Sequence, residues 1–432
     1  MKIAIVGFAT EGRVSLEYFR ARGHEVTVCD QNDSVAVPAG VTTQLGAEYL
    51  HDLDRFDLIV RTAGMHPSVI LDQNLDVADK ITTAVNEFLS HCPTPNTIGV
   101  TGTKGKGTTS TLITKMLEAS GKKVWLGGNI GNSPLEFIDQ VQPEDYVVLE
   151  LSSFQLIDLK HSPYIGVCLM VVPEHLNWHE DFEEYIAAKQ QLFIHQNSDD
   201  IAIYYAPNED SESIADASEG QLVPFYAPPG ALVEANEVKI DGVSICQTNE
   251  MKMLGEHNWQ NACAAVTAVW QTGVRDVEAI RSVLTSFTGL PHRLEFVREL
   301  DGVRYYDDSF GTTPETAIVA LQAFEEPKVV ILGGSDKGAH YNELAKAVKS
   351  TDVRHAVLIG DEAEKIKTQL DLVGFTSYTL GLTTMETMVA TLRKHSAPGD
   401  IALLSAGCAS FGLFEDYKDR GNQFKEAVQA LS

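Results

Sequence analysis

A glycine-rich segment between a predicted strand and a predicted helix constrains the fold of this chain more than any other feature. The apolar run Thr97–Thr101 is typical of a buried strand, and the segment Gly102–Thr109 that follows is rich in glycine. Apolar side chains then recur on one face of a helix that Gly121 is placed to end. A strand, a glycine loop and a helix in this order aim backbone N–H groups at phosphate, and Lys106 adds a positive charge. The segment therefore predicts a phosphate-binding loop and ATP use.

The loop departs from the strict phosphate-loop pattern G-x-x-x-x-G-K-[ST] at two positions. Val100 stands where the first glycine belongs, and Gly107 replaces the hydroxyl residue that should follow the lysine. Thr108 and Thr109 are the nearest hydroxyl groups. A glycine-rich connection without a ligand is the alternative interpretation of the loop taken alone.

Strand and helix signals alternate along the chain, which predicts an α/β protein with parallel sheets. A proline-rich linker near residue 93 and a break near residue 289 divide its 432 residues. We expect three domains, 1–93, 94–289 and 290–432. The first and third are Rossmann-like, and the central one is a P-loop-type mononucleotide-binding sheet with a small antiparallel patch. Hairpins are predicted at Asp241-Gly242 and Asp301-Gly302. The predicted strands include Ile3–Val6, Glu25–Cys29, Leu58–Val60, Tyr146–Leu149, Ile165–Val172, Val329–Leu332, Ala356–Ile359 and Ile401–Leu404, and the predicted helices include Gly12–Arg22 and His257–Thr272.

The turn after the first predicted strand is close to a dinucleotide-binding fingerprint. It runs from Gly7 to Gly12, and Asp30 ends the second strand, but Ala9 stands where the middle glycine belongs. A nicotinamide or flavin cofactor is therefore weakly supported. A nucleotide or phosphate near the helix N-terminus and a purely structural turn explain these residues equally well.

The composition is strongly acidic, with 60 Asp and Glu against 33 Lys and Arg and a net charge of −27. Such a surface repels phosphate backbones and anionic membranes, so nucleic-acid binding is not expected. None of the six cysteines forms a C-x-x-C pair, which favours buried, reduced thiols. No apolar stretch reaches membrane-spanning length, and we expect a cytoplasmic enzyme.

Two further segments carry side chains suited to metal chemistry. The strand Tyr146–Leu149 runs into Glu150, at the position where a magnesium-linked acid sits in nucleotidases. His175 and His179 are spaced i, i+4 beside acidic residues and could bind a metal. Capping or packing is the alternative role for either histidine, and more so for His179.

A lysine lies on the apolar face of the next predicted helix. Lys189 shares that face with Ile186 and Phe193 at helical spacing. Periodicity alone predicts a surface lysine whose ammonium group reaches water along an apolar stem.

Together these motifs resemble the Mur ligase family of peptidoglycan-precursor enzymes. The likeness spans nearly the whole chain, and it is greatest for the branch of the family that adds D-glutamate. The motifs, in chain order, are Thr101-Gly102-Thr103-Lys104-Gly105-Lys106; Gly127-Gly128-Asn129-Ile130-Gly131; Glu150-Leu151-Ser152-Ser153-Phe154-Gln155-Leu156; Glu174-His175; Ala187-Ala188-Lys189; Leu254-Gly255-Glu256-His257-Asn258 with Asn261; Gly289-Leu290-Pro291-His292-Arg293; Asp308-Ser309; Gly333-Gly334-Ser335-Asp336-Lys337-Gly338; and Ser405-Ala406-Gly407-Cys408-Ala409-Ser410, followed by Arg420-Gly421-Asn422.

The resemblance implies an ATP-dependent amide ligase of peptidoglycan synthesis. ATP would phosphorylate the carboxylate of UDP-N-acetylmuramoyl-L-alanine, and the amine of D-glutamate would attack the acyl phosphate. The first domain would bind the UDP portion of the substrate, the central domain ATP, and the C-terminal domain the amino acid. Two Mg²⁺ ions, small-molecule substrates only and a monomeric chain are implied as well.

The resemblance also assigns residues to roles. Glu150 and Thr108 would hold one Mg²⁺, and His175 and Lys189 a second. Because a lysine ammonium has no acceptor, the second role requires the carbamylated lysine that the family carries. The catalytic residues would be Lys106, Glu150, His175 and Lys189; ATP would be bound by Gly102, Thr103, Lys104, Gly105, Lys106, Gly107, Thr108, Thr109, Asn258, Asn261, Arg293 and Asp308; and the other substrates by Asn129, Ser152, His175, Thr312, Lys337, Ser410 and Tyr417.

The sequence departs from the family pattern at several of these positions. Gly107 removes a hydroxyl group, Glu174 stands where Asp is usual, and Phe310 and Gly311 replace Lys-Ala. Tyr417 stands where Phe is usual in the amino-acid pocket. The departures at Phe310 and Tyr417 leave a ligase for L-glutamate or another amino acid as an alternative. The departure at Gly107 leaves a catalytically inactive nucleotide-binding paralogue with a regulatory or scaffold role as another.

Overall fold

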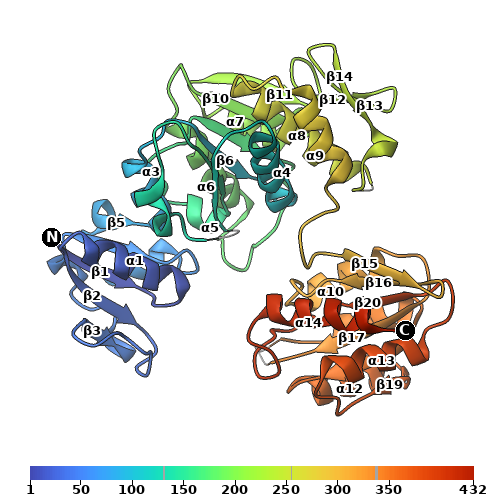
Figure 1. Ribbon diagram of the computed structural model, residues 1–432. Coiled ribbons are helices and arrows are strands. Elements are labelled where there is room, and N and C mark those ends of the chain that lie inside the picture. The colour runs from blue at the N-terminus through green and yellow to red at the C-terminus, as the bar shows by residue number, and fades with distance from the viewer. Residues whose placement is uncertain (130–131, 254, 336–338) are drawn as a thin grey trace. The chain divides into compact units, whose positions relative to one another are not determined.

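The computed structural model describes residues 1–129, 132–253, 255–335 and 339–432. The chain forms two compact units, Met1–Phe287 and Thr288–Ser432, which are described separately below (Figure 1). Within the described residues, no helix is both long and apolar enough to cross a bilayer. All six cysteines are free thiols, as predicted, and five of them are buried. The predicted domain boundaries at residues 93 and 289 stay a prediction.

The first unit begins with a parallel five-stranded sheet in the order β3-β2-β1-β4-β5. This is the Rossmann-like order that the N-terminal pattern predicts. The predicted strands β1, β2 and β4 are present, whereas the short polar strand β3 and the two-residue strand β5 had no recognisable signal. The elements are β1 (Lys2–Val6), α1 (Thr10–Ala21), β2 (Glu25–Asp30), β3 (Thr42–Leu45), β4 (Leu58–Arg61), α2 (Pro67–Leu71), β5 (Ile81–Thr82) and α3 (Ala84–His91).

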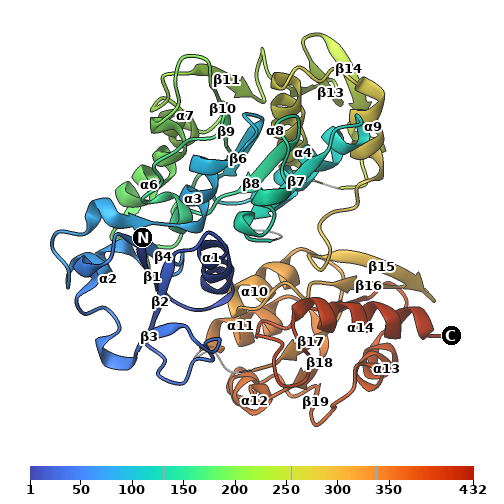
Figure 2. The same ribbon diagram turned by 60° about the vertical axis from the view of Figure 1, so that its left-hand side comes forward.

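A parallel six-stranded sheet, in the order β11-β10-β9-β6-β8-β7, forms the second part of this unit. Its central strand β6 has the predicted bounds and leads directly into the glycine loop and helix α4. Helices α4 and α8 cover one face, and α6 and α7 lie on the other (Figure 2). The elements are β6 (Thr97–Thr101), α4 (Lys106–Ala119), β7 (Val124–Gly128), β8 (Tyr146–Glu150), α5 (Ser153–Leu156), β9 (Ile165–Cys168), α6 (Phe182–Ile194), β10 (Ile201–Tyr205), α7 (Glu209–Ala215), β11 (Gln221–Phe225), α8 (Glu256–Gln271) and α9 (Val277–Ser286).

The predicted antiparallel patch is present as a three-stranded sheet of β12 (Leu232–Glu234), β13 (Glu237–Ile240) and β14 (Val243–Gln247). Asp241 and Gly242 join β13 to β14 with φ of +50° and +76°. Positive φ at both central residues is the geometry of a tight hairpin turn, for which Asp-Gly is well suited.

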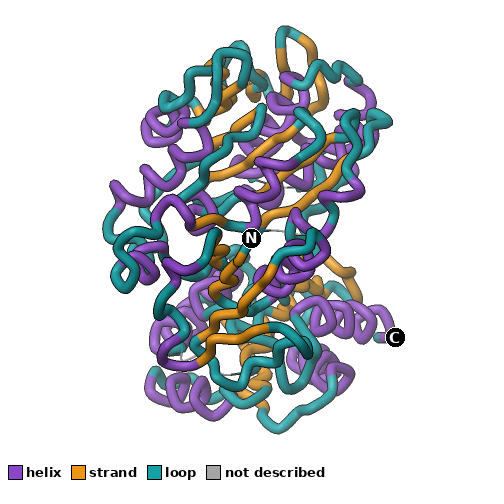
Figure 3. The backbone as a smooth tube through the Cα atoms, turned by 90° about the vertical axis from the view of Figure 1, so that its left-hand side faces the viewer, coloured by secondary structure: helices purple, strands orange, loops and turns teal. Residues whose placement is uncertain are grey.

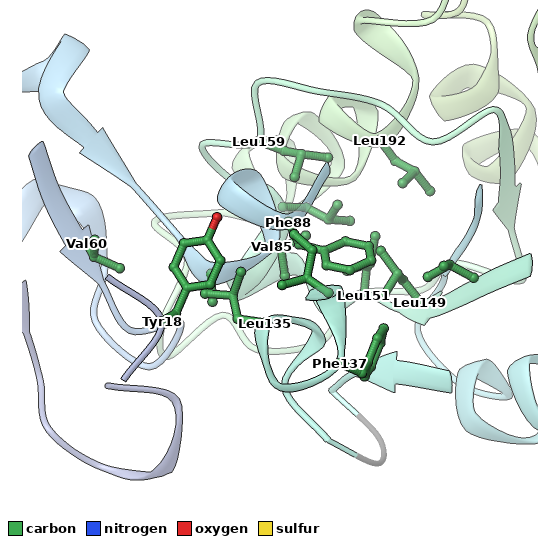
Figure 4. Packing of buried hydrophobic residues seen from close by; sticks show 14 of the residues in the cluster. Tyr18, Val60, Val85, Phe88, Leu135, Phe137, Leu149, Leu151, Leu159 and Leu192 are labelled. Atoms are coloured by element: carbon green, nitrogen blue, oxygen red, sulfur yellow. The ribbon is translucent and has the colours of Figure 1, made fainter. Parts of the chain in front are cut away.

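One continuous apolar core joins the N-terminal sheet to the central sheet. Figure 4 shows Tyr18 from α1 and Phe88 from α3 beside Leu135, Phe137 and Leu149 of the central part. The rings of Phe88 and Phe137 meet edge to face at 5.6 Å. The side chains of residues 1–93 and 94–287 therefore share a core, which explains why the two parts form a single unit.

A fully buried arginine reinforces this junction. Arg61, at the end of β4, donates two hydrogen bonds to the Asp158 carboxylate, at 2.6 and 2.5 Å. Its guanidinium group also donates to the carbonyl oxygens of Phe154 and Met65, each at 2.9 Å. A buried charge is tolerated only when it is fully paired in this way.

Loss of one partner of this ion pair should be costly. We expect Arg61→Met to lower the free energy of unfolding by about 3–5 kcal/mol, because the Asp158 carboxylate would be left without its counter-ion. Denaturant unfolding followed by circular dichroism measures this loss. Arg22→Met is the matched control, since the Arg22–Asp139 pair is exposed and should contribute less than about 1 kcal/mol. Equal losses in the two variants would contradict the prediction.

The second unit is a three-layer α/β structure around the sheet β15-β16-β20-β17-β18-β19, in which only β15 is antiparallel. Val330 and Leu332 pack under α10, α11 and α12, whereas Val329 and Ile331 pack under α13 and α14. Strand residues alternate between the two faces, and burial of both faces is typical of a parallel sheet. Strands and helices are distinguished in Figure 3. The elements are β15 (Glu295–Leu300), β16 (Val303–Asp307), α10 (Pro314–Gln322), β17 (Lys328–Gly333), α11 (Asn342–Ser350), β18 (Val353–Ile359), α12 (Ala363–Leu372), β19 (Tyr378–Thr379), α13 (Met385–His395), β20 (Ile401–Leu404) and α14 (Tyr417–Ala430).

Candidate active site

The glycine loop joins β6 to α4 through backbone conformations that favour glycine. The φ angle is +140° at Gly102 and +87° at Gly105. A Cβ atom at Gly105 would lie 2.2 Å from Oδ1 of Asn261, so a side chain there would displace the asparagine. The Lys106 ammonium folds back over the loop and donates to the carbonyl oxygens of Gly102, at 3.0 Å, and Thr103, at 2.9 Å. The loop therefore places its lysine beside its own backbone.

Lys189 on α6 is buried beneath the same loop, so the surface role expected from helix periodicity is wrong. The residue is only 1% exposed. Its Nζ donates to the Gly102 carbonyl oxygen at 3.1 Å and to Thr101 Oγ1 at 3.4 Å, and it lies 4.4 Å from the centre of the Tyr185 ring. Burial, and then the nearby Lys106 charge, lower the pKa of Lys189 to about 7. A substantial fraction of this amine is therefore neutral near neutral pH.

Tyr185 supports the loop from the same helix, a role that sequence analysis did not predict. Its hydroxyl group lies 3.0 Å from Thr103 Oγ1, which also donates to the Val172 carbonyl oxygen at 3.0 Å. The Thr103 N–H donates to the Met170 carbonyl oxygen at 2.9 Å. Tyr185 stands four residues before Lys189, so helical spacing alone could have placed it on the same face.

Glu150 ends β8 directly beside the strand that leads into the loop. It pairs with Val100 of β6, and its Oε1 accepts a hydrogen bond from Asn129 Nδ2 at 2.7 Å. Its Oε2 is buried and has no hydrogen-bond partner within the described parts of the chain. A buried carboxylate oxygen is energetically unfavourable unless a cation or a hydrogen-bond donor binds it. The position therefore suits a hard cation such as Mg²⁺.

His175 lies close to both lysines of the loop region. Burial is the main cause that lowers its pKa, with smaller contributions in the same direction from the Lys106 and Lys189 charges. The side chain is 45% exposed, and its ring centre lies 4.8 Å from that of Phe154. Its φ of +58° is uncommon for a residue with a side chain. A histidine of lowered pKa that reaches solvent is available as a ligand.

His179 is packed in the protein interior, which is the alternative role that the sequence analysis named for it. Its Nδ1 lies 3.1 Å from Glu184 Oε2 and its Nε2 lies 2.9 Å from Ser153 Oγ. The residue is 2% exposed. Because both ring nitrogens have partners, the two histidines do not form a metal-binding pair.

The residues expected to border the muramoyl group also stabilise local structure. Ser152 is the N-cap of α5, and its hydroxyl accepts the Gln155 N–H at 3.4 Å. In turn, the Gln155 side chain accepts a hydrogen bond from the Ser152 N–H at 3.1 Å. The two reciprocal hydrogen bonds form a capping box. The Asn129 N–H donates to the Glu150 carbonyl oxygen at 2.8 Å.

Helix α8 brings Asn261 against the loop and forms a hollow there. Thr109 Oγ1 lies 3.5 Å from Asn261 Oδ1, and Asn261 Nδ2 lies 3.4 Å from Asn258 Oδ1. Thr108, half-buried in the first turn of α4, is one residue nearer to the loop. The adjoining cavity of about 160 Å³ is lined by Lys104, Gly105, Leu169, Met170, Tyr205, Phe225, His257, Gln260 and Asn261.

In the second unit, Asp308 lies in the loop after β16, where its carboxylate is buried. Its Oδ2 accepts the Ser405 hydroxyl at 2.8 Å, and its Oδ1 accepts the Leu294 N–H at 3.2 Å. Burial raises the pKa of Asp308 to about 6. The half-buried Thr312 follows in the same loop, and Ser410 lies buried after β20. Lys337 lies outside the described residues.

Arg420 is a structural residue whose role the sequence did not reveal. Its buried guanidinium group donates to Ser309 Oγ at 2.9 Å, to the Ser309 carbonyl oxygen at 2.8 Å and to the Cys408 carbonyl oxygen at 3.1 Å. It thereby joins the loop after β16 to the loop after β20. Arg420 is spaced i, i+4 from the buried Phe424, so a charge on the apolar face of α14 was the available signal.

The raised pKa of Asp308 predicts a pH dependence of stability. Below about pH 4 the group is protonated in both folded and unfolded chains, and as the pH rises through about 6 the folded chain loses stability. We expect Asp308→Asn to remove this loss, worth about 3 kcal/mol at pH 7.5. Urea unfolding between pH 4 and 7.5 tests this, with exposed Asp361→Asn as the control. A pH-independent difference between Asp308→Asn and the wild type would refute it.

The sheets, the glycine loop and the buried Lys189 together define an α/β enzyme with a phosphate loop. Residues 100–269 match the Mur ligase middle domain, and residues 292–408 match the Mur ligase glutamate ligase domain. The chain is 35% identical to the UDP-N-acetylmuramoylalanine–D-glutamate ligase of Clostridium kluyveri, over 100% of this chain and 97% of that protein. It is 34% identical to the enzyme of the same name from Clostridium tetani, with the same coverage.

Solved structures of related enzymes share this fold. The UDP-N-acetylmuramate–alanine ligase MurC of Thermotoga maritima has a TM-score of 0.57 at 18% identity and covers 100% of this chain and 99% of that one. The MurF ligase of T. maritima in complex with ADP has a TM-score of 0.57 at 17% identity, covering 99% and 94%. The chain belongs to the Mur ligase family, and it is a ligase that forms carbon–nitrogen bonds.

Proposed function

We propose that this ligase joins D-glutamate to UDP-N-acetylmuramoyl-L-alanine with ATP, a step of peptidoglycan-precursor synthesis in the cytoplasm, and that it acts as a monomer. The names of the clostridial relatives support this substrate pair. The observation that carries the proposal is the buried Lys189 amine, 3.1 Å from the Gly102 carbonyl oxygen of the phosphate loop. An amine of lowered pKa so close to the phosphate loop suits conversion into a carbamate that holds a metal ion there.

The first chemical step brings two anions together, so positive charge is needed at the loop. The substrate carboxylate attacks the γ-phosphorus of ATP, the bond to the β-phosphate oxygen breaks, and ADP leaves. Lys106 would neutralise the β- and γ-phosphates while the loop N–H groups hold them. The D-glutamate amine then attacks the acyl carbon and loses one proton to solvent, and the tetrahedral intermediate breaks its bond to the phosphate oxygen to form the amide and free phosphate.

The side chains present fit Mg²⁺. The unpartnered Glu150 Oε2 provides a hard oxygen ligand, and Thr108 would add a hydroxyl group beside it. Bound Mg²⁺ supplies a Lewis acid that neutralises phosphate charge. His175 and Lys189 would hold a second ion, which completes the two-ion arrangement that we propose.

Lys189 can act as a metal ligand only after covalent modification, because an ammonium group has no lone pair to offer a metal ion. The neutral amine would attack the carbon of CO₂ with its lone pair, form an N–C bond and release one proton to solvent. The product is a carbamate whose oxygens resemble a carboxylate. The lowered pKa of Lys189 favours this reaction, since only the neutral amine is nucleophilic.

The remaining assignments concern recognition of the substrates. In the N-terminal part, a hollow of about 350 Å³ is lined by Phe8, Arg13, Leu16, Glu17, Arg20 and Pro38, and its two arginines suit the UDP diphosphate. ATP would contact the loop residues Gly102–Thr109 together with Asn258, Asn261, Arg293 and Asp308. The muramoyl group would meet Asn129, Ser152 and His175, and the amino acid would meet Thr312, Lys337, Ser410 and Tyr417.

A phosphate-release assay with a panel of amino acids tests the proposal. Release should require UDP-N-acetylmuramoyl-L-alanine, ATP, Mg²⁺ and D-glutamate together, and omission of any one should abolish it. Equal turnover with L-glutamate would favour the alternative specificity. No turnover with any amino acid would favour an inactive paralogue.

The unusual Gly107 should tolerate a hydroxyl side chain. It lies within α4 and is not among the residues of positive φ, so its backbone does not require glycine. We expect Gly107→Ser to keep nucleotide affinity within about two-fold of wild type and to stabilise the helix by about 0.5 kcal/mol. Calorimetric titration with an unhydrolysable ATP analogue measures the affinity. A loss above ten-fold would mean that the phosphates occupy the space beside Gly107.

A further inference from the structure

Phe310 is a large apolar side chain that stays 39% exposed in the loop after β16. Its backbone N–H donates to the His292 carbonyl oxygen at 2.9 Å, which fixes the loop against the segment that leads into β15. The backbone of Phe310 is therefore held in place, while its side chain remains partly exposed.

The face of the Phe310 ring is covered by a cation. The guanidinium carbon of Arg293 lies 3.9 Å from the ring centre. The negative face of an aromatic ring attracts a guanidinium group, and the planar group can stack on it. The ring thus limits the conformations open to Arg293, the residue that we assign to ATP.

The Phe310 ring also contacts Tyr417, a residue that we assign to the amino-acid subsite. The rings of Phe310 and Tyr417 are 5.1 Å apart and nearly perpendicular, at 87°. Tyr417 also packs edge to face on His292 at 6.0 Å, and its carbonyl oxygen accepts the Ser309 hydroxyl at 2.8 Å. Phe310 therefore contacts Tyr417, which we assign to the incoming amino acid, as well as Arg293.

From these contacts we infer that Phe310 is a positioning residue that holds Arg293 and Tyr417 in place and so couples the nucleotide and amino-acid subsites. This inference rests on the roles proposed above for Arg293 and Tyr417. The ring itself needs no contact with substrate. Its effect on catalysis passes through the two side chains that it orders.

Five variants of the 432-residue chain test the inference. Phe310→Leu removes the ring and keeps an apolar side chain, whereas Phe310→Tyr keeps the ring. Phe296→Leu is the matched control, because Phe296 is 50% exposed in the same unit and packs on Tyr306. The double variant Phe310→Leu/Arg293→Gln, compared with Arg293→Gln alone, isolates the contact between the two side chains.

Loss of the ring should weaken nucleotide binding without unfolding the protein. We expect Phe310→Leu to reduce the affinity for an unhydrolysable ATP analogue by about 3- to 10-fold, the effect of one partly exposed cation–π contact. The KM for D-glutamate should rise by a similar factor, while kcat changes less than two-fold. Phe310→Tyr and Phe296→Leu should match the wild type in both measurements. In the Arg293→Gln background, Phe310→Leu should have no further effect on nucleotide affinity.

Two outcomes would overturn the inference. One is equal behaviour of Phe310→Leu and the wild type, and the other is an undiminished effect of Phe310→Leu on nucleotide affinity when Arg293 is already glutamine. The nucleotide titration needs no acceptor substrate, so it tests the Phe310–Arg293 contact even if the wild type does not use D-glutamate. Failure of the wild type in the phosphate-release assay would instead contradict the proposed function.

Discussion

Replacing Lys189 with alanine is expected to reduce turnover by on the order of 100- to 1000-fold, the usual loss when one preorganised charge-stabilising group is removed. The amine lies against the phosphate loop and is 1% exposed, a degree of burial that only Lys328 matches among the described lysines. Steady-state phosphate release measures the effect. Lys115→Ala, an exposed lysine on α4, is the matched control and should keep full activity.

The same residue makes a second, independent measurement possible. In buffer free of CO₂, burial penalises the charged amine, and the penalty is fully present below about pH 7. It is relieved as the pH rises from about 7 toward 10.5, because the folded chain then releases the proton before the unfolded chain does. Lys189→Met should therefore stabilise the fold most at pH 6 and least at pH 10.

Carbamate formation can be measured separately. In the presence of ¹³CO₂, the NMR spectrum of the wild type should show a carbamate carbon signal, and this signal should be absent in Lys189→Met. Full activity of Lys189→Ala would contradict the assignment.

The second large effect is expected at Glu150. Glu150→Gln keeps the shape of the side chain and an oxygen that can accept the Asn129 hydrogen bond, but removes the negative charge beside the loop. We expect turnover to fall by on the order of 100-fold or more, together with a rise in the Mg²⁺ concentration that gives half-maximal rate. Titration of the rate with Mg²⁺ separates these two quantities.

Glu144→Gln provides the control for this experiment. Glu144 is exposed shortly before the other end of the same strand β8, so its loss tests the general effect of removing one carboxylate. An unaltered Mg²⁺ dependence in Glu150→Gln would mean that the unpartnered oxygen is not a metal ligand. A loss of thermal stability alone, without a change in Mg²⁺ dependence, would lead to the same conclusion.

The sequence predicted the local architecture around the loop well, because strand and helix periodicity and glycine positions are local signals. The bounds of β6 were predicted correctly, and the helix after the loop ends as Gly121 indicates, with φ of +78°. Strand β9 is shorter than predicted because its neighbour β6 ends at Thr101. Beyond Cys168 the chain contacts the glycine loop, as the hydrogen bond between Thr103 and Met170 shows.

Features that depend on tertiary contacts were harder to predict. Periodicity placed Lys189 on an apolar face but could not tell whether that face was covered by the loop. The family resemblance assigned Lys189 its role, and the structure supplies the burial that suits it. The polar strand β3 and the two-residue strand β5 carry no hydrophobic alternation of their own, since pairing with β2 and β4 determines them. The contact between Arg293 and Phe310 joins residues 17 positions apart, which no short motif encodes.

The core shared by the N-terminal and central sheets has a consequence for how the chain folds during synthesis. Phe88 packs on Phe137, and the buried Arg61 is paired with the carboxylate of Asp158. The first ninety residues therefore leave the ribosome before their partners exist. Nascent chains fold as units once the contacting segments have emerged, so the N-terminal sheet cannot complete its burial until roughly seventy further residues are translated. During that interval part of its apolar surface stays uncovered.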